Sequence, residues 1–262
     1  MKLKIIALAA MALVWPDSAA AHFQLLYTPK VNLEKAGDVT FKMVFWHPLE
    51  NGYMMDMAKP QAVYYRHKGK TVDLLDQIKA IDYHGPTNNA AAFEVTTAVR
   101  RLGDYTFVVE PAPYLEASED IYIQQFTKTY VNRGGVPTDW MEPVGLAAEI
   151  VPQNKPTNIL TGSTFSGRVM TSGQPVAGAE IEIEYIAAAL DVENNATFEP
   201  TVSPASGGTI VAISDAAGYF SFGIPKAGFW GFAALDVGPE KEHEGKSLSQ
   251  DAVIWIRAFD FE

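Results

Sequence analysis

The sequence contains no cysteine among its 262 residues. The protein therefore has no disulfide to stabilise it, and packing must hold it together. It also has no thiolate for a metal ion, which leaves His, Met, Asp, Glu and backbone nitrogen as ligands. Basic side chains are scarce too: there are 20 Lys and Arg against 31 Asp and Glu, and the formal net charge is −11. This balance argues against nucleic acid and anionic lipid as partners and suits the capture of cations.

Long hydrophobic runs are also missing. The run that opens the chain, "IIALAAMALVW" at residues 5–15, is too short to cross a bilayer as a helix, which takes about 20 apolar residues. Lysines precede it, and the small residues Ala19 and Ala21 follow it, as signal peptidase requires. The pattern predicts a Sec-type signal peptide over residues 1–21, export to the periplasm, and no transmembrane segment in the mature chain.

Helix signals are almost absent. Short segments rich in β-branched and aromatic residues alternate with turn residues instead, for example "VTFKMVFW" at residues 39–46, and this pattern is typical of strands. The residues "HKGK" at 67–70 predict a tight hairpin turn, which would leave His67 in solvent. The segment "RRLGDYTFVVEP" has the pattern of a sandwich strand with a tyrosine corner at Tyr105. The predicted fold class is all-β.

The chain is long enough for two ordinary domains, each with its own core. Residues 151–158, "VPQNKPTN", concentrate Pro, Asn and Gln between two strand-rich halves, as a linker does. A polar stretch at 191–209 is expected to be a long loop or an irregular hairpin. We therefore predict two β-sandwich domains, immunoglobulin-like or transthyretin-like, over residues 22–153 and 154–262.

Motifs of the common catalytic frameworks are missing as well. The sequence has no nucleophile elbow, no glycine-rich phosphate loop and no HExxH zinc motif. Paired acids such as Glu182 and Glu184 indicate solvated strand faces. We therefore expect a binding protein rather than an enzyme.

His22 stands directly after the predicted cleavage point, in "AAAHFQ". Cleavage after Ala21 would make it the first residue, so its free α-amine and its imidazole could chelate one metal ion; coordination readily displaces the proton of the amine. Nitrogen ligands of this kind bind late first-row divalent metals, and their affinity rises along the series toward copper. The alternative is that a signal peptide must end somewhere and a histidine follows by chance.

A second group of candidate ligands lies in residues 45–57, "FWHPLENGYMMDM". His47 ends a predicted strand and the proline after it turns the chain, and binding groups gather where strand ends face loops. Glu50 and any one of the methionines are further candidates. In the alternative interpretation the methionines fill the core under a long loop; they are Met54, Met55 and Met57.

The remaining histidines are weaker candidates for metal ligands. His84 precedes Gly-Pro in an expected loop, and His243 lies in the charged stretch "KEHEGK". Because the aromatic segment "AGFWGFAAL" comes shortly before that stretch and suggests a packed platform, His243 is the better candidate ligand of the two.

Several segments follow one another along the chain: "AHFQLLYTP", "HPLENGYMMDMAKP", "YTFVVEPAPYLEASEDIYIQQFTKT" and "HEGKSLSQDAVIWI". In this order they resemble a family of exported proteins with an uncharacterised domain, assigned to nickel/cobalt uptake as the periplasmic component of ABC (ECF-type) transport. The resemblance implies metal handling for His22 and His47, with His243 as a third site residue. Members of that family can carry a histidine before a "YTKT"-like segment. This chain has Gln124 and Gln125 there, so a ligand at that place is lost or replaced.

The second half contains "SGQPVAGAEIEI" and "SDAAGYFSFGIP". These segments resemble carboxypeptidase-regulatory, transthyretin-like domains. The resemblance implies a β-sandwich that serves as a scaffold and says almost nothing about function.

We therefore expect a periplasmic, non-enzymatic protein that binds a divalent transition-metal ion, nickel or cobalt. His22 and His47 would bind the ion, with His243 or a carboxylate such as Glu50 completing the site. The expected partner is a membrane metal permease complex that takes up the ion.

Two other functions stay open. One is a copper-binding histidine brace, either a carrier or an oxidase acting on polysaccharide, for which Trp46 and Tyr53 would offer an aromatic substrate face beside His47. The other is a β-sandwich adhesion or scaffold protein in which the histidines are incidental. Nickel and cobalt cannot be distinguished by ligand type, because their preferences overlap.

Overall fold

The computed structural model of the chain describes residues 22–204 and 209–261. Its secondary structure is almost all strand, with one 3-10 turn, η1 (Leu75–Gln77), and no α-helix among the described residues. The predicted all-β class is therefore confirmed.

The predicted signal peptide, residues 1–21, lies outside the described residues. No helix in the part of the chain that the structure describes is long and apolar enough to cross a membrane.

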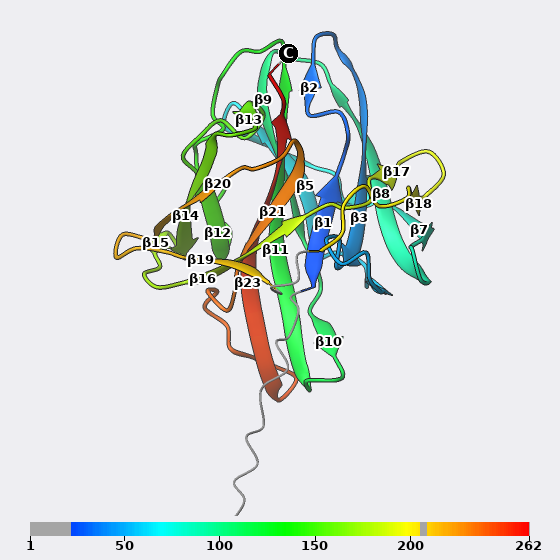
Figure 1. The fold of residues 1–262 in the computed structure, drawn as a ribbon, viewed down its shortest axis with the longest axis vertical. Coiled ribbons are helices and arrows are strands. Elements are labelled where there is room, and N and C mark those ends of the chain that lie inside the picture. Colours follow the sequence, from blue (N-terminus) through cyan, green and yellow to red (C-terminus); the bar gives the residue numbers. More distant parts are fainter. Residues whose placement is uncertain (1–21, 205–208, 262) are drawn as a thin grey trace, which may run out of the picture.

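A seven-stranded sheet, sheet I, is built mainly from the first half of the chain (Figure 1). Its strands pair in the order β1-β3-β8-β7-β18-β17, and β4 pairs with β3. The bounds are β1 (Phe23–Tyr27), β3 (Gly37–Trp46), β4 (Met54–Met55), β7 (Lys79–His84), β8 (Asn89–Val99), β17 (Leu190–Asp191) and β18 (Ala196–Thr197).

A twelve-stranded sheet, sheet II, runs through both halves in the order β19-β16-β21-β23-β11-β9-β5-β6. Four short strands are attached to it: β2 and β10 pair with β11, and β13 and β22 with β23. The main strands are β5 (Ala62–His67), β6 (Lys70–Asp73), β9 (Gly103–Glu110), β11 (Ile121–Arg133), β16 (Glu180–Tyr185), β19 (Ile210–Ile213), β21 (Gly228–Ala234) and β23 (Lys246–Phe259). The attached strands are β2 (Asn32–Leu33), β10 (Tyr114–Glu116), β13 (Ile159–Leu160) and β22 (Glu242–His243).

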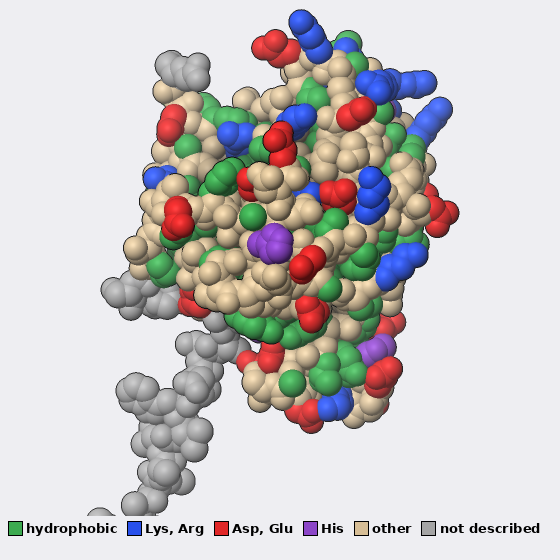
Figure 2. All heavy atoms as spheres, turned by 90° about the vertical axis from the view of Figure 1, so that its right-hand side faces the viewer, with side chains coloured by type: hydrophobic (Ala, Val, Ile, Leu, Met, Phe, Trp, Pro, Cys, Tyr) green, Lys and Arg blue, Asp and Glu red, His purple; other side chains and the backbone are tan. Residues whose placement is uncertain are grey.

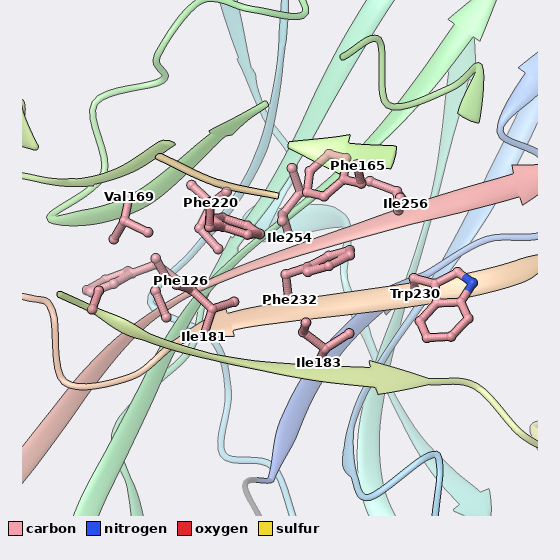
Figure 3. Packing of buried hydrophobic residues seen from close by; sticks show 14 of the residues in the cluster. Phe126, Phe165, Val169, Ile181, Ile183, Phe220, Trp230, Phe232, Ile254 and Ile256 are labelled. Carbon is pink, nitrogen blue, oxygen red and sulfur yellow. The ribbon is translucent and has the colours of Figure 1, made fainter. Parts of the chain in front are cut away.

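A four-stranded sheet, sheet III, covers the second half of sheet II. It contains β12 (Ala148–Pro152), β14 (Thr164–Thr171), β15 (Gln174–Pro175) and β20 (Tyr219–Gly223). Phe165 and Phe220 from this sheet pack against Phe232 of β21, with ring centres 4.6 and 5.8 Å away. Figure 3 shows these rings beside Ile181 and Ile254 in the core of this sandwich.

Sheet I is covered on both faces. In β3 every side chain from Phe41 to Trp46 is buried, although alternate residues of a strand point to opposite faces. On one face, the ring of Phe41 lies 4.1 Å from that of Phe107 in sheet II. On the other face, Trp46 belongs to a buried cluster with Trp255 of β23. This double burial explains why residues 39–46 form a nearly continuous apolar run rather than an alternating one.

Three strand pairings among the described residues join the halves on either side of the predicted boundary at residue 153. The long strands β11 and β23 pair in parallel, from Tyr122 opposite Leu248 to Lys128 opposite Ile254. In addition, the stretch expected as a loop or irregular hairpin forms the hairpin β17–β18, and β18 pairs with β7 of sheet I. The strand β12, which ends directly before the predicted boundary, pairs with β14 beyond it.

Three local predictions have clear outcomes. The tyrosine corner is confirmed, because the Tyr105 hydroxyl donates to the carbonyl oxygen of Arg101 at 3.0 Å. The solvated setting predicted for His67 is wrong: its ring is buried, stacks on Tyr105 at 4.1 Å and donates from Nδ1 to a carbonyl oxygen at 2.8 Å. Glu182 and Glu184 are also buried rather than solvated; the loop after β3 lies on this face of β16, where Leu49 donates its backbone N–H to Glu184.

Candidate metal centre

The antiparallel register of β1 and β3 brings His22 and His47 together. Phe23 pairs with Trp46 at the end of this ladder, and one further step in the same register places His22 opposite His47. Opposite residues of an antiparallel pair share one face of the sheet. The two imidazole rings lie 4.2 Å apart, centre to centre, with an interplanar angle of 48°. The two histidines that the sequence singles out are therefore neighbours in space.

Strand β10 closes the histidine pair from the side of sheet II. Residues two apart on a strand point the same way, so Tyr114 and Glu116 both face His22. The Tyr114 ring lies 6.2 Å from the His22 ring. Glu116 Oε2 lies 3.5 Å from His22 Nε2, and Glu116 Oε1 accepts hydrogen bonds from the backbone N and the Oγ of Ser118 at 3.0 and 2.6 Å. The carboxylate is therefore held in place by its own turn.

Gln125 of β11 fixes the start of β1. Its Nε2 donates to the carbonyl oxygen of His22 at 2.6 Å, and its Oε1 accepts from the backbone N of Gln24 at 2.6 Å. The Nε2 also donates to the buried carboxylate of Asp251 at 3.1 Å. Gln125 thus holds the backbone of His22 and of Gln24. This side chain positions the candidate site without offering it an imidazole.

Charge and burial favour the metal-binding form of these side chains. Burial, helped by the nearby His47, lowers the pKa of His22 to about 4, although Glu116 acts in the opposite direction. Burial alone would raise the pKa of Glu116, but its hydrogen bonds from Ser118 and the two histidines bring that pKa below its ordinary value. At neutral pH the site therefore offers a neutral His22 imidazole next to an ionised carboxylate, the forms in which both groups bind metal ions.

The other predicted ligands lie elsewhere. His243 of β22 packs edge-on against Tyr122, with ring centres 4.7 Å apart. Glu50 is exposed in the loop after β3, and its charge acts on Glu184 of the second half. Within the described residues, no group of three or more His, Cys, Asp or Glu side chains is arranged to hold a metal ion. The structure therefore does not gather His243 or Glu50 with the histidine pair.

The methionines of the same loop are buried. Met54 and Met55 form β4 and belong to two different core clusters, so the core-filling interpretation is confirmed for them. Met57 is also buried, but its Sδ accepts a 3.5 Å hydrogen bond from Gln24 Nε2 and faces a cavity near His22.

Sequence reasoning missed Glu116 and Gln125. Both residues come from β10 and β11, far along the chain from the histidines. One signal was present for Gln125: two glutamines interrupt the otherwise strand-like segment "IYIQQFTK". Buried amides inside a strand need hydrogen-bond partners, and for Gln125 one partner is the backbone of His22.

Acidic side chains surround this end of sheet II. Figure 2 shows them on the narrow lower end of the molecule, where β10 and β23 lie in Figure 1, while Lys and Arg gather mainly on the upper part of that face. The acids of the β10–β11 turn and of β22 with its turn are Glu116, Glu119, Asp120, Glu242 and Glu244. Clustered negative charge raises the local concentration of cations.

One family model matches most of the chain: a domain of unknown function, DUF4198, matches residues 19–238. A search of curated proteins finds no match. Nothing in the comparisons concerns nickel or cobalt transport.

Among solved structures, the chain is similar to the D0–D1 domain of intimin, with 13% identity, 87% of this chain and 95% of that chain covered, and a TM-score of 0.21. It is also similar to fibronectin(III)-like modules of CbhA from Clostridium thermocellum, with 8% identity, coverage of 89% and 95%, and a TM-score of 0.19. The N-terminal eight immunoglobulin domains of the Down syndrome cell adhesion molecule match with 12% identity, coverage of 92% and 28%, and a TM-score of 0.21. These TM-scores are too low to transfer any property to this chain.

Proposed function

Because the chain belongs to the DUF4198 family, a domain of unknown function, we propose its function from the site itself: it binds a divalent transition-metal ion at His22 and His47. One observation carries the proposal, namely the two imidazole rings 4.2 Å apart at the open ends of β1 and β3. Structural histidines in a core are usually held by single hydrogen bonds to the backbone, as His67 is. A pair of histidines side by side at strand ends, next to an ionised carboxylate, suits a cation instead.

The predicted export route adds a third nitrogen. Cleavage after Ala21 frees the α-amine of His22, which then binds the ion together with the imidazole of the same residue. The resulting set is two imidazoles, one amine and the Glu116 carboxylate, a combination that suits nickel, cobalt or copper. Gln125 holds the His22 carbonyl oxygen and so orients this terminus, as residues behind metal ligands commonly do.

We further propose that the ion is nickel or cobalt and that the protein is a periplasmic, non-enzymatic carrier for a membrane metal permease complex. A site at a chain terminus and at the edge of a sheet allows the ion to be exchanged, which transfer to a permease requires. The acidic end of sheet II supports the capture of cations before they reach the histidines.

The experiment is metal titration of protein purified from the periplasm, after an intact-mass measurement of its first residue. We expect a chain that begins at His22 and binds one nickel or cobalt ion with a Kd below about 10 µM. His22→Ala and His47→Ala should each weaken binding by at least about tenfold, because each removes a direct ligand.

His84→Ala is the matched control, since His84 is an exposed histidine on β7, which β8 separates from β3 in sheet I. Its affinity should equal that of the unaltered protein. The proposal is wrong if no metal binds in this range, or if the three histidine variants behave alike.

Copper is the second candidate, favoured by the same geometry: an amino-terminal histidine and an internal one on a β-sheet form a brace of nitrogen ligands. The predicted aromatic face is only partly present, because Trp46 is fully buried and donates from Nε1 to the carbonyl oxygen of Gly52 at 3.0 Å, while Tyr53 is exposed. A copper EPR spectrum typical of nitrogen ligands would support copper binding. Ascorbate-driven peroxide production would be needed to support oxidase activity.

A further inference from the structure

A cavity of about 340 Å³ lies next to the histidine pair. It opens between β3, β10 and β11, and its lining includes Phe45, Tyr114, Leu115 and Ile123. This volume lies at the lower end of the roughly 300–1,000 Å³ that small-molecule sites enclose. The walls are mostly apolar or aromatic, as in sites that hold the body of an organic ligand.

The cavity and the histidine pair share three side chains. Phe45 and Tyr114 line the cavity, and their rings lie 5.5 and 6.2 Å from the ring of His22. Gln125 also lines it and donates to the carbonyl oxygen of His22. Neither histidine lines the cavity, so a molecule in it would reach the site past Phe45, Tyr114 and Gln125, the side chains that contact His22.

The lining limits the charge of the occupant. Its one charged residue is the acid Asp56, and neither Lys nor Arg takes part. Glu116 adds negative charge two residues from Tyr114. These acids would attract a chelate that keeps the positive charge of its ion, as the complex of a neutral chelator does and that of an anionic chelator does not.

The polar groups of the cavity are largely engaged already. Gln24 Nε2 donates to two carbonyl oxygens and to the Sδ of Met57. Both ends of the Gln125 amide are bound within the protein as well. Few hydrogen bonds remain for a ligand, so shape and apolar contact must supply its affinity.

The metal site itself is short of protein ligands. The two imidazoles lie side by side and the Glu116 carboxylate lies 3.5 Å from His22, but no group of three or more His, Cys, Asp or Glu side chains among the described residues is arranged to hold a metal ion. Even with the α-amine, a six-coordinate ion would keep open positions. The cavity is where donor atoms for those positions could enter.

We propose that the protein takes up its ion together with a small, neutral, bidentate organic chelator, whose donor atoms fill the open positions while its apolar body lies between Phe45, Tyr114 and Leu115. This inference rests on the proposed metal site at His22 and His47. It changes the cargo from a bare ion to a metal chelate.

The test uses nickel and 2,2′-bipyridine, a neutral aromatic chelator, with native mass spectrometry and titration calorimetry. Nickel alone is titrated first, which tests the proposed function by itself. The nickel-loaded protein is then titrated with bipyridine, and we expect one ternary complex of protein, nickel and chelator.

Ala58→Trp adds a large side chain at an exposed position of the cavity lining, to which neither histidine belongs. It should leave nickel binding unchanged and weaken the binding of bipyridine to the nickel-loaded protein by at least about tenfold, because the apolar space is filled. Ala216→Trp, at an exposed turn of the second half, is the control and should change neither value.

The outcomes separate the two proposals. If nickel does not bind, the metal site and this inference both fail. If nickel binds but bipyridine removes it from the protein, or binds equally well to Ala58→Trp, the chelate inference is overturned and the metal site stands. A ternary complex that Ala58→Trp alone weakens supports both.

Discussion

Glu184 is a buried carboxyl group where the loop after β3 meets β16. Its Oε2 accepts a 2.9 Å hydrogen bond from the backbone N of Leu49. Burial raises its pKa to about 8; that hydrogen bond lowers it in part, and the charges of Glu50 and Glu182 raise it further. The folded protein therefore keeps a proton on Glu184 at a pH where the unfolded chain has lost it.

This proton makes stability depend on pH. Glu184 has a higher pKa in the folded state than its value of 4.5 in the unfolded chain. Folding is therefore most favourable for this group below pH 4.5, and the free energy of unfolding falls as the pH rises toward 8. We expect Glu184→Gln, which keeps an acceptor for Leu49, to match the parent protein at pH 4 and to be more stable at pH 8. Between these values the gain grows by up to about 1.4 kcal/mol per pH unit.

Urea unfolding at pH 4, 6 and 8 measures this difference in the free energy of unfolding. Glu180→Gln is the control, because Glu180 is exposed on the same strand and should show no such trend. A difference for Glu184→Gln that stays constant across the three pH values would contradict the prediction.

At the scale of elements, β1 is bound on two sides: by β3 through the ladder and by β11 through Gln125. The ladder sets which residue is opposite His22, and the Gln125 amide holds the carbonyl oxygen of His22 and the backbone N of Gln24. The direction in which the His22 side chain points therefore depends on a strand far away in sequence.

We predict that Gln125→Ala weakens metal binding by about tenfold, in the range usual for residues that orient a ligand. The matched control is Gln124→Ala, since Gln124 is equally buried but donates to Gln61 and Pro111 rather than to His22. Both variants should lose about 1–3 kcal/mol of stability, because each leaves buried groups without partners. Titration calorimetry distinguishes them; equal losses of metal affinity in both would refute an orienting role.

The site was predictable from the sequence only in part, and the reason lies in its elements. His22 and His47 stood out because one follows an expected cleavage point and the other ends a strand. Their proximity depends on a ladder between neighbouring strands, which a sequence pattern suggests but does not fix in register. Glu116 and Gln125 reach the site through long-range pairings of β10 and β11, and no local pattern specifies those.

At the scale of the whole molecule, the all-β class could be predicted because strand and turn signals are local. The single sheet that both halves share could not be predicted. The parallel pairing of β11 with β23 joins residues far apart in sequence. An irregular hairpin was one of two alternatives for the polar stretch, but nothing local predicted that β18 would pair with β7. Residues 22–153 and 154–262 remain a predicted division of a chain whose halves share their largest sheet.

The shared sheet leads to a prediction about cooperativity. Separating the halves would expose the facing edges of β11 and β23 and those of β12 and β14. Unpaired strand edges leave backbone hydrogen-bonding groups without their partners, which is costly. We therefore expect one unfolding transition in calorimetry, with a van't Hoff enthalpy equal to the calorimetric one.

Lys128→Met tests whether destabilising the first half lowers the unfolding temperature of both halves, because buried Lys128 on β11 and Glu149 on β12 form an ion pair there, with Nζ and Oε1 2.6 Å apart. It leaves Glu149 buried without its cation, which should lower stability by about 3–5 kcal/mol while the unfolding stays a single transition at a lower temperature. Lys246→Met is the control, because Lys246 pairs with Asp120 at an exposed position and its loss should change stability little. Two separate transitions, in the parent protein or in Lys128→Met, would show that the halves fold independently despite the continuous sheet.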